Sequence, residues 1–342
     1  MLRYAVKRLL LLIPTFFGVT FIAFGIMLLA PGDPVELFFS GGLGAATEGI
    51  SQEKLAEVEK AKTEMRRELG LDQSIPLQYA SWMGRLLRGD LGTSFKDRRP
   101  VWTKIRERLP VTMLLSGLSL VITYLVAVPL GIYSSVRVGR LGDQVSTVLV
   151  FMLYSLPVFW IGTLIIIFFG GGDFFAWFPA AGLHSLDYSP NWPLWRKLGD
   201  YLHHLAMPLL CMVYTSFAAL SRFMRTSMLE SANMDFVRTA RAKGLGERIV
   251  VLKHILRNSL IPIVTILAGI LPAMIGGSVI IETIFSIPGI GQLGYQAVLA
   301  RDYPVVLALF AASSFLTLLG ILLADLLLAL VDPRISFGRV RA

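Results

Sequence analysis

Residues 111–136 read VTMLLSGLSLVITYLVAVPLGIYSSV, a run of 26 residues without a charged side chain. A helix needs about 20 predominantly apolar residues to cross the hydrocarbon core of a bilayer, so this stretch predicts a transmembrane helix. Five other apolar runs pass the same test, although one contains Pro157 and another contains an acid, Asp325. The six predicted spans are residues 9–30, 111–136, 144–172, 201–221, 258–281 and 303–331.

The composition of the whole chain agrees with a membrane protein. Of its 342 residues, 55% are hydrophobic and 16% are charged, whereas soluble domains carry about 25% charged residues. This balance argues against a soluble enzyme and against a disordered chain. The single cysteine, Cys211, excludes an internal disulfide and a Cys-rich zinc site. We therefore predict the all-α fold class: a polytopic membrane protein with six transmembrane helices.

The first span is interpreted as a retained helix. Its apolar run exceeds the roughly 7–15 residues of a signal-peptide core, and Leu29-Ala30-Pro31 is not a typical cleavage site. We accordingly divide the chain into an N-terminal segment with the first span (1–30), an extracytoplasmic subdomain (31–110) and a transmembrane core (111–342).

Lysine and arginine in the short connections predict the orientation. If both termini are cytoplasmic, the short inside segments hold 16 Lys and Arg residues and the short outside loops hold three. This asymmetry follows the positive-inside rule. It also accounts for much of the net charge of +9 without a nucleic-acid partner. The inside segments are 1–8, 137–143, 222–257 and 332–342, and the short outside loops are 173–200 and 282–302.

Residues 31–110 are too long for a bare connection. Helical spacing of apolar residues predicts one helix over 52–69, a second is expected over 76–87, and residues 89–94 read as a turn. Two interpretations stay open at this point. The segment is either a cap over the membrane helices or a docking surface for an outside partner.

Residues 222–257 form the longest inside segment and carry eight basic and three acidic residues. Asp235 is a plausible cap for a short helix over 236–243, and Gly244 is a plausible stop. A second helix over 247–258 is expected to continue into the fifth span. The segment suits docking of a cytoplasmic partner, but an anchor on anionic membrane lipid would favour the same charges.

Sequence motifs for catalysis are missing. The chain has no Gly-x-x-x-x-Gly-Lys-Ser/Thr phosphate loop, no His-Glu-x-x-His and no Gly-x-Ser-x-Gly. Asp325 is the only acid within a predicted span, and we favour a structural pairing for it over a transport role. Gly269, Ala273 and Gly277 recur every four residues and predict a helix-packing stripe in the fifth span.

The segment 222–257 also carries a resemblance. Its stretches RTSMLE (225–230) and DFVRTARAKGL (235–245) resemble the cytoplasmic loop of ABC-importer permeases of the dipeptide, oligopeptide and nickel branch. Of the wider superfamily pattern Glu-Ala-Ala-x-x-x-Gly, followed by Ile-x-Leu-Pro, only Ala240, Gly244 and Leu256 are kept. Similar stretches occur in matching order at 1–4, 31–35, 89–94, 282–291, 301–305 and 332–335.

The resemblance implies a set of partners. Such permeases pair with a second homologous permease, with two cytoplasmic ATPase subunits and with an extracytoplasmic substrate-binding protein. ATP and Mg²⁺ would then bind the ATPases, and no cofactor is expected in this chain. The resemblance also implies a multi-pass protein of the bacterial or archaeal cytoplasmic (inner) membrane, in contact with lipid.

The short helix would be the coupling helix that docks in a groove of the ATPase. Small residues at Thr239, Ala240 and Gly244 would let it enter the groove, and Arg238 and Arg241 would pair with acids there. The residues implied in ATPase coupling are Phe236, Arg238, Thr239, Ala240, Arg241 and Gly244.

We therefore predict a permease subunit, not itself an enzyme, of an ATP-driven importer for di- or oligopeptides. Nickel or another small solute is an alternative cargo within the same machinery. An ion-coupled secondary transporter and an intramembrane protease are the alternatives from other classes. The sequence alone does not separate peptide from nickel.

Overall fold

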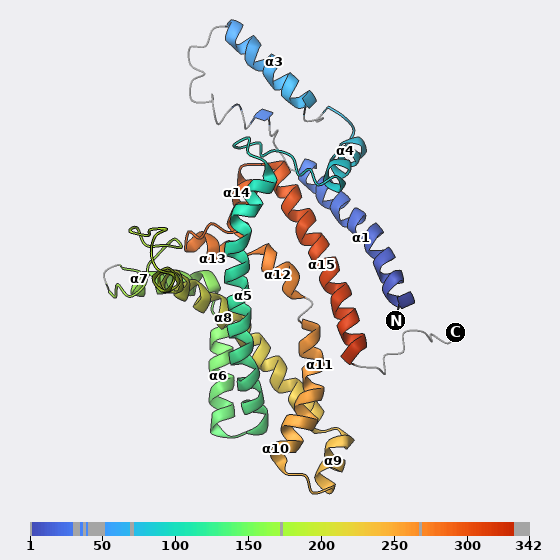
Figure 1. The fold of residues 1–342 in the computed structure, drawn as a ribbon, viewed down its shortest axis with the longest axis vertical. Helices are drawn as coiled ribbons and strands as arrows, with labels where there is room; N and C mark the ends of the chain where they lie inside the picture. The colour runs from blue at the N-terminus through green and yellow to red at the C-terminus, as the bar shows by residue number, and fades with distance from the viewer. Residues whose placement is uncertain are drawn as a thin grey trace. The chain divides into compact units, whose positions relative to one another are not determined.

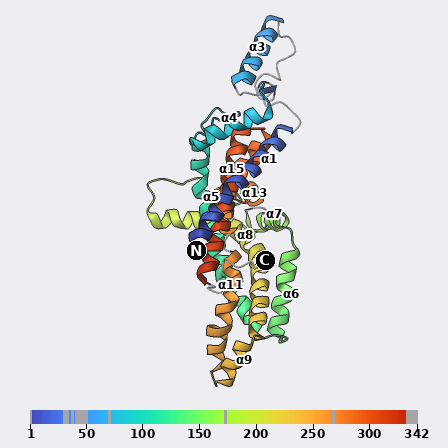
Figure 2. The same ribbon diagram turned by 90° about the vertical axis from the view of Figure 1, so that its right-hand side faces the viewer.

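The computed structural model describes residues 2–29, 35–36, 39, 52–68, 72–171, 174–266 and 269–331 (Figures 1 and 2). The regular elements of these residues are helices, accompanied by two isolated β-bridges. They are α1 (Leu2–Leu29), α3 (Gln52–Glu68), α4 (Ile75–Leu87), α5 (Val101–Val136), α6 (Leu141–Ser155), α7 (Val158–Phe169), α8 (Leu194–Ala232), α9 (Asp235–Ala242), α10 (Glu247–Ile249), the π-helix η1 (Val250–Ile255), α11 (Leu256–Ile266), α12 (Ile270–Gly276), α13 (Val279–Ile284), α14 (Ile290–Leu299) and α15 (Tyr303–Val331).

Four of these helices are individually long and apolar enough to cross a membrane: α1, α5, α8 and α15. They contain the first, second, fourth and sixth predicted spans, which confirms that these runs are helical. Two of them continue well past their apolar cores, because α5 has 36 residues and α8 has 39. The helices predicted over 52–69 and 76–87 correspond to α3 and α4.

The third predicted span is not one helix. It is a pair, α6 and α7, bent by 93° at a short break. Pro157 explains the break, because a proline disfavours helical geometry in the residue before it. Leu156 is indeed extended, with φ −86° and ψ 126°. The pair is therefore either a broken span or a re-entrant segment, and the prediction of a single helix over 144–172 is wrong.

The fifth predicted span is also interrupted. Residues 258–281 are shared among α11, α12 and α13, none of which is long enough to cross a bilayer. Gly277 ends α12 with φ +67°, a conformation that L-residues rarely adopt. Gly269 lies just before α12, so Gly269, Ala273 and Gly277 do not form the predicted packing stripe. Among the described residues, four single helices and one bent pair thus meet the spanning criterion.

The chain forms two compact units, one of which comprises Met1–Ala5, Pro110–Gln292 and Leu319–Ala342. Its centre is α8, which packs against α6, α7, α11 and α13. Two groups of buried apolar side chains surround α8. One contains Leu115, Leu205 and Phe285, and the other contains Met224, Val237 and Val250.

A glycine sets the closest approach between α5 and α8 in this unit. A Cβ atom at Gly131 would lie 2.6 Å from the Met224 Cβ and 2.8 Å from the Ser221 carbonyl oxygen. Both distances are shorter than van der Waals contact, so the two backbones meet only because position 131 has no side chain. Small residues at such crossings are typical of membrane helices.

The other unit comprises Val6–Leu109 and Leu293–Leu318. Tyr79 of α4 fixes α1: its hydroxyl donates to the Phe17 carbonyl (2.9 Å) and shares a hydrogen bond with Thr20 (2.9 Å). The rings of Phe21 and Tyr79 pack edge to face. The domain division at residues 30 and 110 stays a prediction.

A polar cluster in this second unit joins two stretches that are far apart in sequence. Ser94 and the Phe95 N–H both donate to the buried Asp302 carboxylate. Lys104 lies 2.9 Å from Asp97. Burial raises the pKa of Asp97, but hydrogen bonds from Lys104, Ser94 and the backbone outweigh it and bring the pKa to about 2. The predicted turn over 89–94 is thus held against the start of α15.

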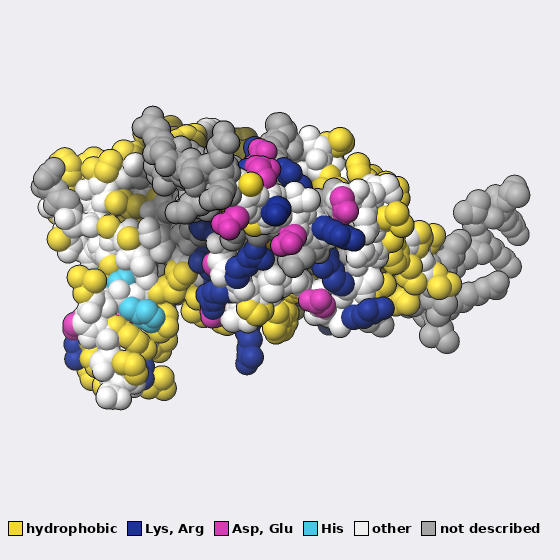
Figure 3. Space-filling view, turned by 90° about the horizontal axis from the view of Figure 1, so that it is seen from above, with side chains coloured by type: hydrophobic (Ala, Val, Ile, Leu, Met, Phe, Trp, Pro, Cys, Tyr) yellow, Lys and Arg dark blue, Asp and Glu magenta, His cyan; other side chains and the backbone are white. Residues whose placement is uncertain are grey.

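Charges of both signs occur together on α3, which carries five acidic and five basic residues. Figure 3 shows one face of the protein on which Lys and Arg side chains mingle with Asp and Glu side chains.

We predict that Gly131→Ala lowers the thermal unfolding midpoint of the detergent-solubilised protein. The added methyl must push α5 from α8, and overpacking of this kind costs about 1–3 kcal/mol. Gly25→Ala in α1 is the control, because nothing lies within 4 Å of a Cβ built there. A Gly131→Ala protein that unfolds at or above the parental temperature would contradict the packing described here.

Candidate coupling site

The candidate site is the segment between α8 and α11, and it begins with a sharp change of direction. Helix α8 ends at Ala232, and α9 starts at Asp235 after an extended Met234 (φ −75°, ψ 151°). Met234 is therefore the N-cap. The predicted cap, Asp235, is instead the first helical residue, where its negative charge still suits the helix dipole.

Gly244 ends α9 as predicted. Its φ is +74°, and two hydrogen bonds close the end of the helix. The Gly244 N–H donates to the Arg241 carbonyl (2.9 Å), and the Leu245 N–H donates to the Ala240 carbonyl (3.4 Å). This pair of bonds is the Schellman arrangement, which strongly favours glycine because the positive φ strains residues with a Cβ.

The two faces of α9 have different surroundings. Val237 and Ala240 are buried and pack in the group that contains Met224 and Val250. The prediction that Ala240 enters a partner's groove is therefore wrong as stated, because Ala240 faces its own chain. The small side chain of Ala240 serves the packing of α9 against its own chain.

The outward face of α9 carries the other residues that the sequence indicated. The side chain of Arg238 is 77% exposed, and Phe236 is 39% exposed although it is a large aromatic residue. Thr239, Arg241 and Gly244 are exposed as well. The face thus combines an aromatic group with cations, a composition that fits a protein interface with acidic residues.

An ion pair bridges the turn after α9. Arg241 donates through Nη2 to Glu247 Oε1 (2.6 Å) and through Nε to Oε2 (3.2 Å). The hydrogen bond from Arg241 lowers the pKa of Glu247. Both side chains are exposed, so the pair adds modestly to stability. Its two-point geometry fixes the turn between α9 and α10.

The returning helix is continuous from α10 through η1 into α11, as predicted for residues 247–258, although the π-turn was not foreseen. Two buried serines bind it to α8. Ser227 Oγ donates to the Ser259 carbonyl (2.9 Å), and Ser259 Oγ donates to the Ser227 carbonyl (3.1 Å). This reciprocal pair makes α8, α9 and α11 one stiff hairpin.

A buried ion pair lies beside this hairpin and was missed from the sequence. Arg225 of α8 donates to both oxygens of Asp143, at 2.9 Å each. The side chain of Asp143 is 5% exposed, and it also accepts hydrogen bonds from Ser134 and from the Gly139 N–H. The α5–α6 connection is thereby fastened to α8. An acid just before an apolar run was the only signal in the sequence.

A second buried acid, Glu282, lies on α13 of the same unit and is fully buried. Its carboxylate accepts hydrogen bonds from the Gln292 N–H (2.8 Å), the Thr112 hydroxyl (3.1 Å) and the Ser278 N–H (3.2 Å). A Cβ at Gly289 would lie 2.3 Å from the Glu282 carboxyl carbon. The loop that follows α13 is thus wrapped around this carboxylate.

Asp325 is half-buried near the end of α15. Its structural pairing stays a prediction. The other residues proposed for coupling are brought together on α9 and its C-terminal turn, and their part in coupling stays a prediction.

These features define a class of protein. The chain is a polytopic helical membrane protein in which a helical hairpin carries a short amphipathic helix, α9. Residues 127–337 match the family described as binding-protein-dependent transport system inner membrane component. Residues 1–116 match the N-terminal membrane component of such systems. The chain belongs to this family of membrane permease components.

Several characterised proteins are similar along their whole length. The oligopeptide transport system permease protein AppB of Bacillus subtilis is 36% identical over 98% of this chain and 100% of its own. The dipeptide transport system permease protein DppB of Escherichia coli is 34% identical over 98% of this chain and 99% of its own. The peptidoglycan transport system permease protein YejB of Agrobacterium fabrum is 34% identical over 98% of both chains.

We predict that Arg225→Met destabilises the protein by about 3–5 kcal/mol, because it leaves a buried carboxylate without its counter-charge. Adding Asp143→Asn should restore part of that loss. Thermal unfolding in detergent measures both effects. Arg238→Met is the control, since an exposed pair contributes about 0–1 kcal/mol. Equal midpoints for Arg225→Met and Arg238→Met would show that the buried pair is not stabilising.

Proposed function

We propose that this chain is one of two permease subunits of an ATP-driven peptide importer, and that α9 docks on a cytoplasmic ATPase. The observation that carries the proposal is the geometry of α9. Val237 and Ala240 fasten the helix to its own chain, while Phe236, Arg238 and Thr239 face away from it. A large aromatic residue that is exposed beside cations is typical of a site that a partner covers.

The proposed mechanism follows from the stiffness of the hairpin. Nucleotide-driven closure of two ATPases would move α9, and α8 and α11 would carry this motion into the membrane. The pathway would then alternate between outward- and inward-open states by rigid-body rearrangement. The chain's sequence contains no phosphate loop, so ATP and Mg²⁺ are assigned to the partner subunits.

The names of three relatives support a peptide or peptide-containing cargo. AppB is named as an oligopeptide permease, DppB as a dipeptide permease and YejB as a peptidoglycan permease. The family description supports dependence on a substrate-binding protein. We assign that protein to the extracytoplasmic side, where residues 31–110 would receive it, and place both termini in the cytoplasm of a bacterium or archaeon.

We predict that Phe236→Asp reduces co-purification of the ATPase subunits and lowers peptide uptake into reconstituted vesicles. The change places a charge in the centre of the proposed interface. Val138→Asp is the matched control, because Val138 is an exposed apolar residue (52%) in the α5–α6 connection. Arg238→Glu should have a smaller effect, as expected for a pair at the rim of an interface.

The outcome at Ala240 separates docking from packing. Ala240→Trp adds bulk inside the chain's own core, so it should lower the thermal unfolding midpoint of the isolated permease, whereas Phe236→Asp should not. If Phe236→Asp assembles and transports like the parent, α9 is not the docking helix, and the alternative of an anchor on anionic lipid is favoured instead.

The proposed topology makes a further prediction. Single cysteines at Glu57 and Lys243 should react with a membrane-impermeant thiol reagent from opposite sides, Glu57 from outside and Lys243 from the cytoplasm. The native Cys211 is buried, so the background should be low. Reaction of both positions from one side would rule out the proposed orientation of the permease.

A further inference from the structure

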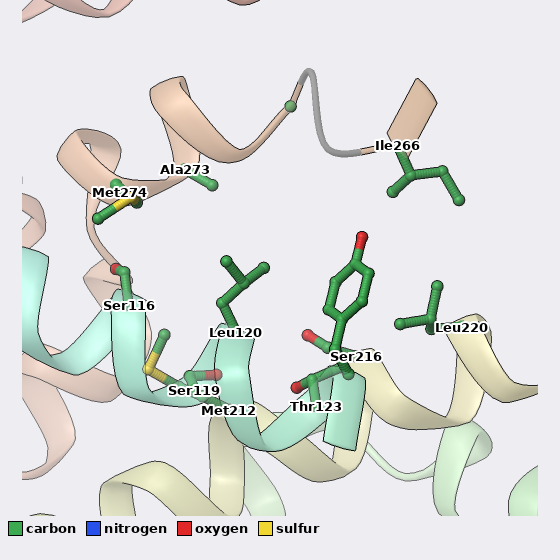
Figure 4. Close-up of a pocket in the computed structure, with 12 residues that line it drawn as sticks. Ser116, Ser119, Leu120, Thr123, Met212, Ser216, Leu220, Ile266, Ala273 and Met274 are labelled. Atoms are coloured by element: carbon green, nitrogen blue, oxygen red, sulfur yellow. The ribbon is translucent and has the colours of Figure 1, made fainter. Parts of the chain in front are cut away.

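A cavity of about 340 Å³ lies in the first unit among α5, α8 and the α11–α12 segment. Figure 4 shows Ser116 and Thr123 of α5 on one side of it and Ala273 and Ile266 on the opposite side. Ser116, Ser119 and Thr123 follow one another at helical spacing, so these three hydroxyl-bearing residues lie on the face of α5 that lines the cavity. The volume falls within the range of small-molecule sites, about 300–1,000 Å³.

Two hydroxyl groups at the cavity lack an intramolecular partner. Thr123 is 3% exposed, and neither its Oγ1 nor the hydroxyl oxygen of Tyr124 makes a hydrogen bond in the described part of the chain. Both residues line the cavity. A buried hydroxyl without a partner is costly in an apolar medium, so it requires an explanation.

Other threonines in the membrane helices show how such a cost is normally avoided. Five of the described threonines donate their hydroxyl to a carbonyl oxygen one turn earlier in their own helix, at 2.7–3.3 Å. Thr123 has the same opportunity within α5 but does not use it. The threonines that do are Thr15, Thr20, Thr163, Thr215 and Thr317.

The opposite wall of the cavity comes from the fifth predicted span. Ile266 at the end of α11, Gly269, and Ala273 and Met274 of α12 line it. Nothing lies within 4 Å of a Cβ atom built at Gly269, so open space adjoins this residue.

The lining restricts the chemistry of what the cavity can bind. The described residues that line it include no charged side chain. Serine, threonine and tyrosine hydroxyls can donate and accept, which matches the N–H and C=O groups of an amide. Met212 and Met274 add flexible apolar surface that can adapt to side chains of different shape.

We infer that this cavity is a transient binding site for the uncharged backbone amides of a peptide on its way through the membrane. Recognition through amides would make binding largely independent of the side chains of the cargo. Ser116 and Tyr124 lie within the apolar run 111–136, which is long enough to cross a bilayer. The inference rests on the proposed function for its assumption that the cargo is a peptide.

The test uses the complete importer in proteoliposomes, with both permeases, the ATPases and the binding protein. The probe is radiolabelled trialanine, and import and ATP hydrolysis are measured together. Thr123→Val and Tyr124→Phe each remove a hydroxyl with little change of shape. Each should lower the peptide imported per ATP by about two- to tenfold, the loss expected from one hydrogen bond.

The matched control is Thr163→Val, which removes a hydroxyl that donates within its own helix to the Phe159 carbonyl (2.8 Å). It should import like the parent. A merely structural role of Thr123 would lower ATP hydrolysis and import in parallel, so an unchanged import per ATP in Thr123→Val and Tyr124→Phe overturns the inference. If the parent complex itself imports no trialanine, the proposal of a peptide cargo is wrong, and the inference that depends on it is wrong as well.

A second measurement asks whether another protein covers the cavity instead. Ser216 of α8 lines it and is exposed in the single chain. Ser216→Cys should react with a small thiosulfonate reagent in the assembled importer, and the reaction should block import. Reaction in the isolated permease but not in the assembled complex would show that the second permease fills the cavity, and that result overturns the inference.

Discussion

A carboxylate that is fully buried in a membrane protein must receive hydrogen bonds from the groups around it. Glu282 imposes this constraint on the first unit. It draws the N–H groups of Ser278 and Gln292 and the hydroxyl of Thr112 onto one side chain. Thr112 in turn accepts from the Ile290 N–H. Helix α5, helix α13 and the start of α14 are thereby held together, and Phe285 and Ile287 are set into the apolar group around α8.

At the other end of α8, other buried polar groups are likewise satisfied by partners on neighbouring elements. The Asp143–Arg225 pair and the Ser227–Ser259 pair are buried or nearly so, and in each a polar group finds its partner on another element. Breaking one such pair leaves a desolvated group behind, so the elements resist sliding past one another. In the mechanism proposed above, α9 would pass its motion to α8 and α11 through these ties.

The sequence predicted what depends on local pattern and failed where distant partners decide. Charge-free runs identified the apolar helices, and Gly244 marked the end of α9, because each signal lies within one continuous stretch of the sequence. The pairing of Arg225 with Asp143 joins positions 82 residues apart, and no local pattern reveals it. The interruptions of two predicted spans were missed, because hydropathy averaged over a long run does not register single residues such as Pro157 and Gly277. Ala240 was assigned to the wrong face because the small residues of a docking helix do not themselves reveal the packing that holds it.

The position of α8 connects the two ends of the proposed mechanism. Ser216 lines the cavity, and Ser227 ties α8 to the returning helix beside α9. The two serines are eleven positions apart, which corresponds to roughly 16 Å along one continuous helix. A displacement of the hairpin would therefore reach the cavity through a single stiff element. The opposite wall includes Ala273 and Met274 of α12, a separate and shorter helix that Gly277 ends with φ +67°. The two walls of the cavity thus belong to different helices. A movement of α8 would change the shape of the space between them, as alternate binding and release of a cargo require.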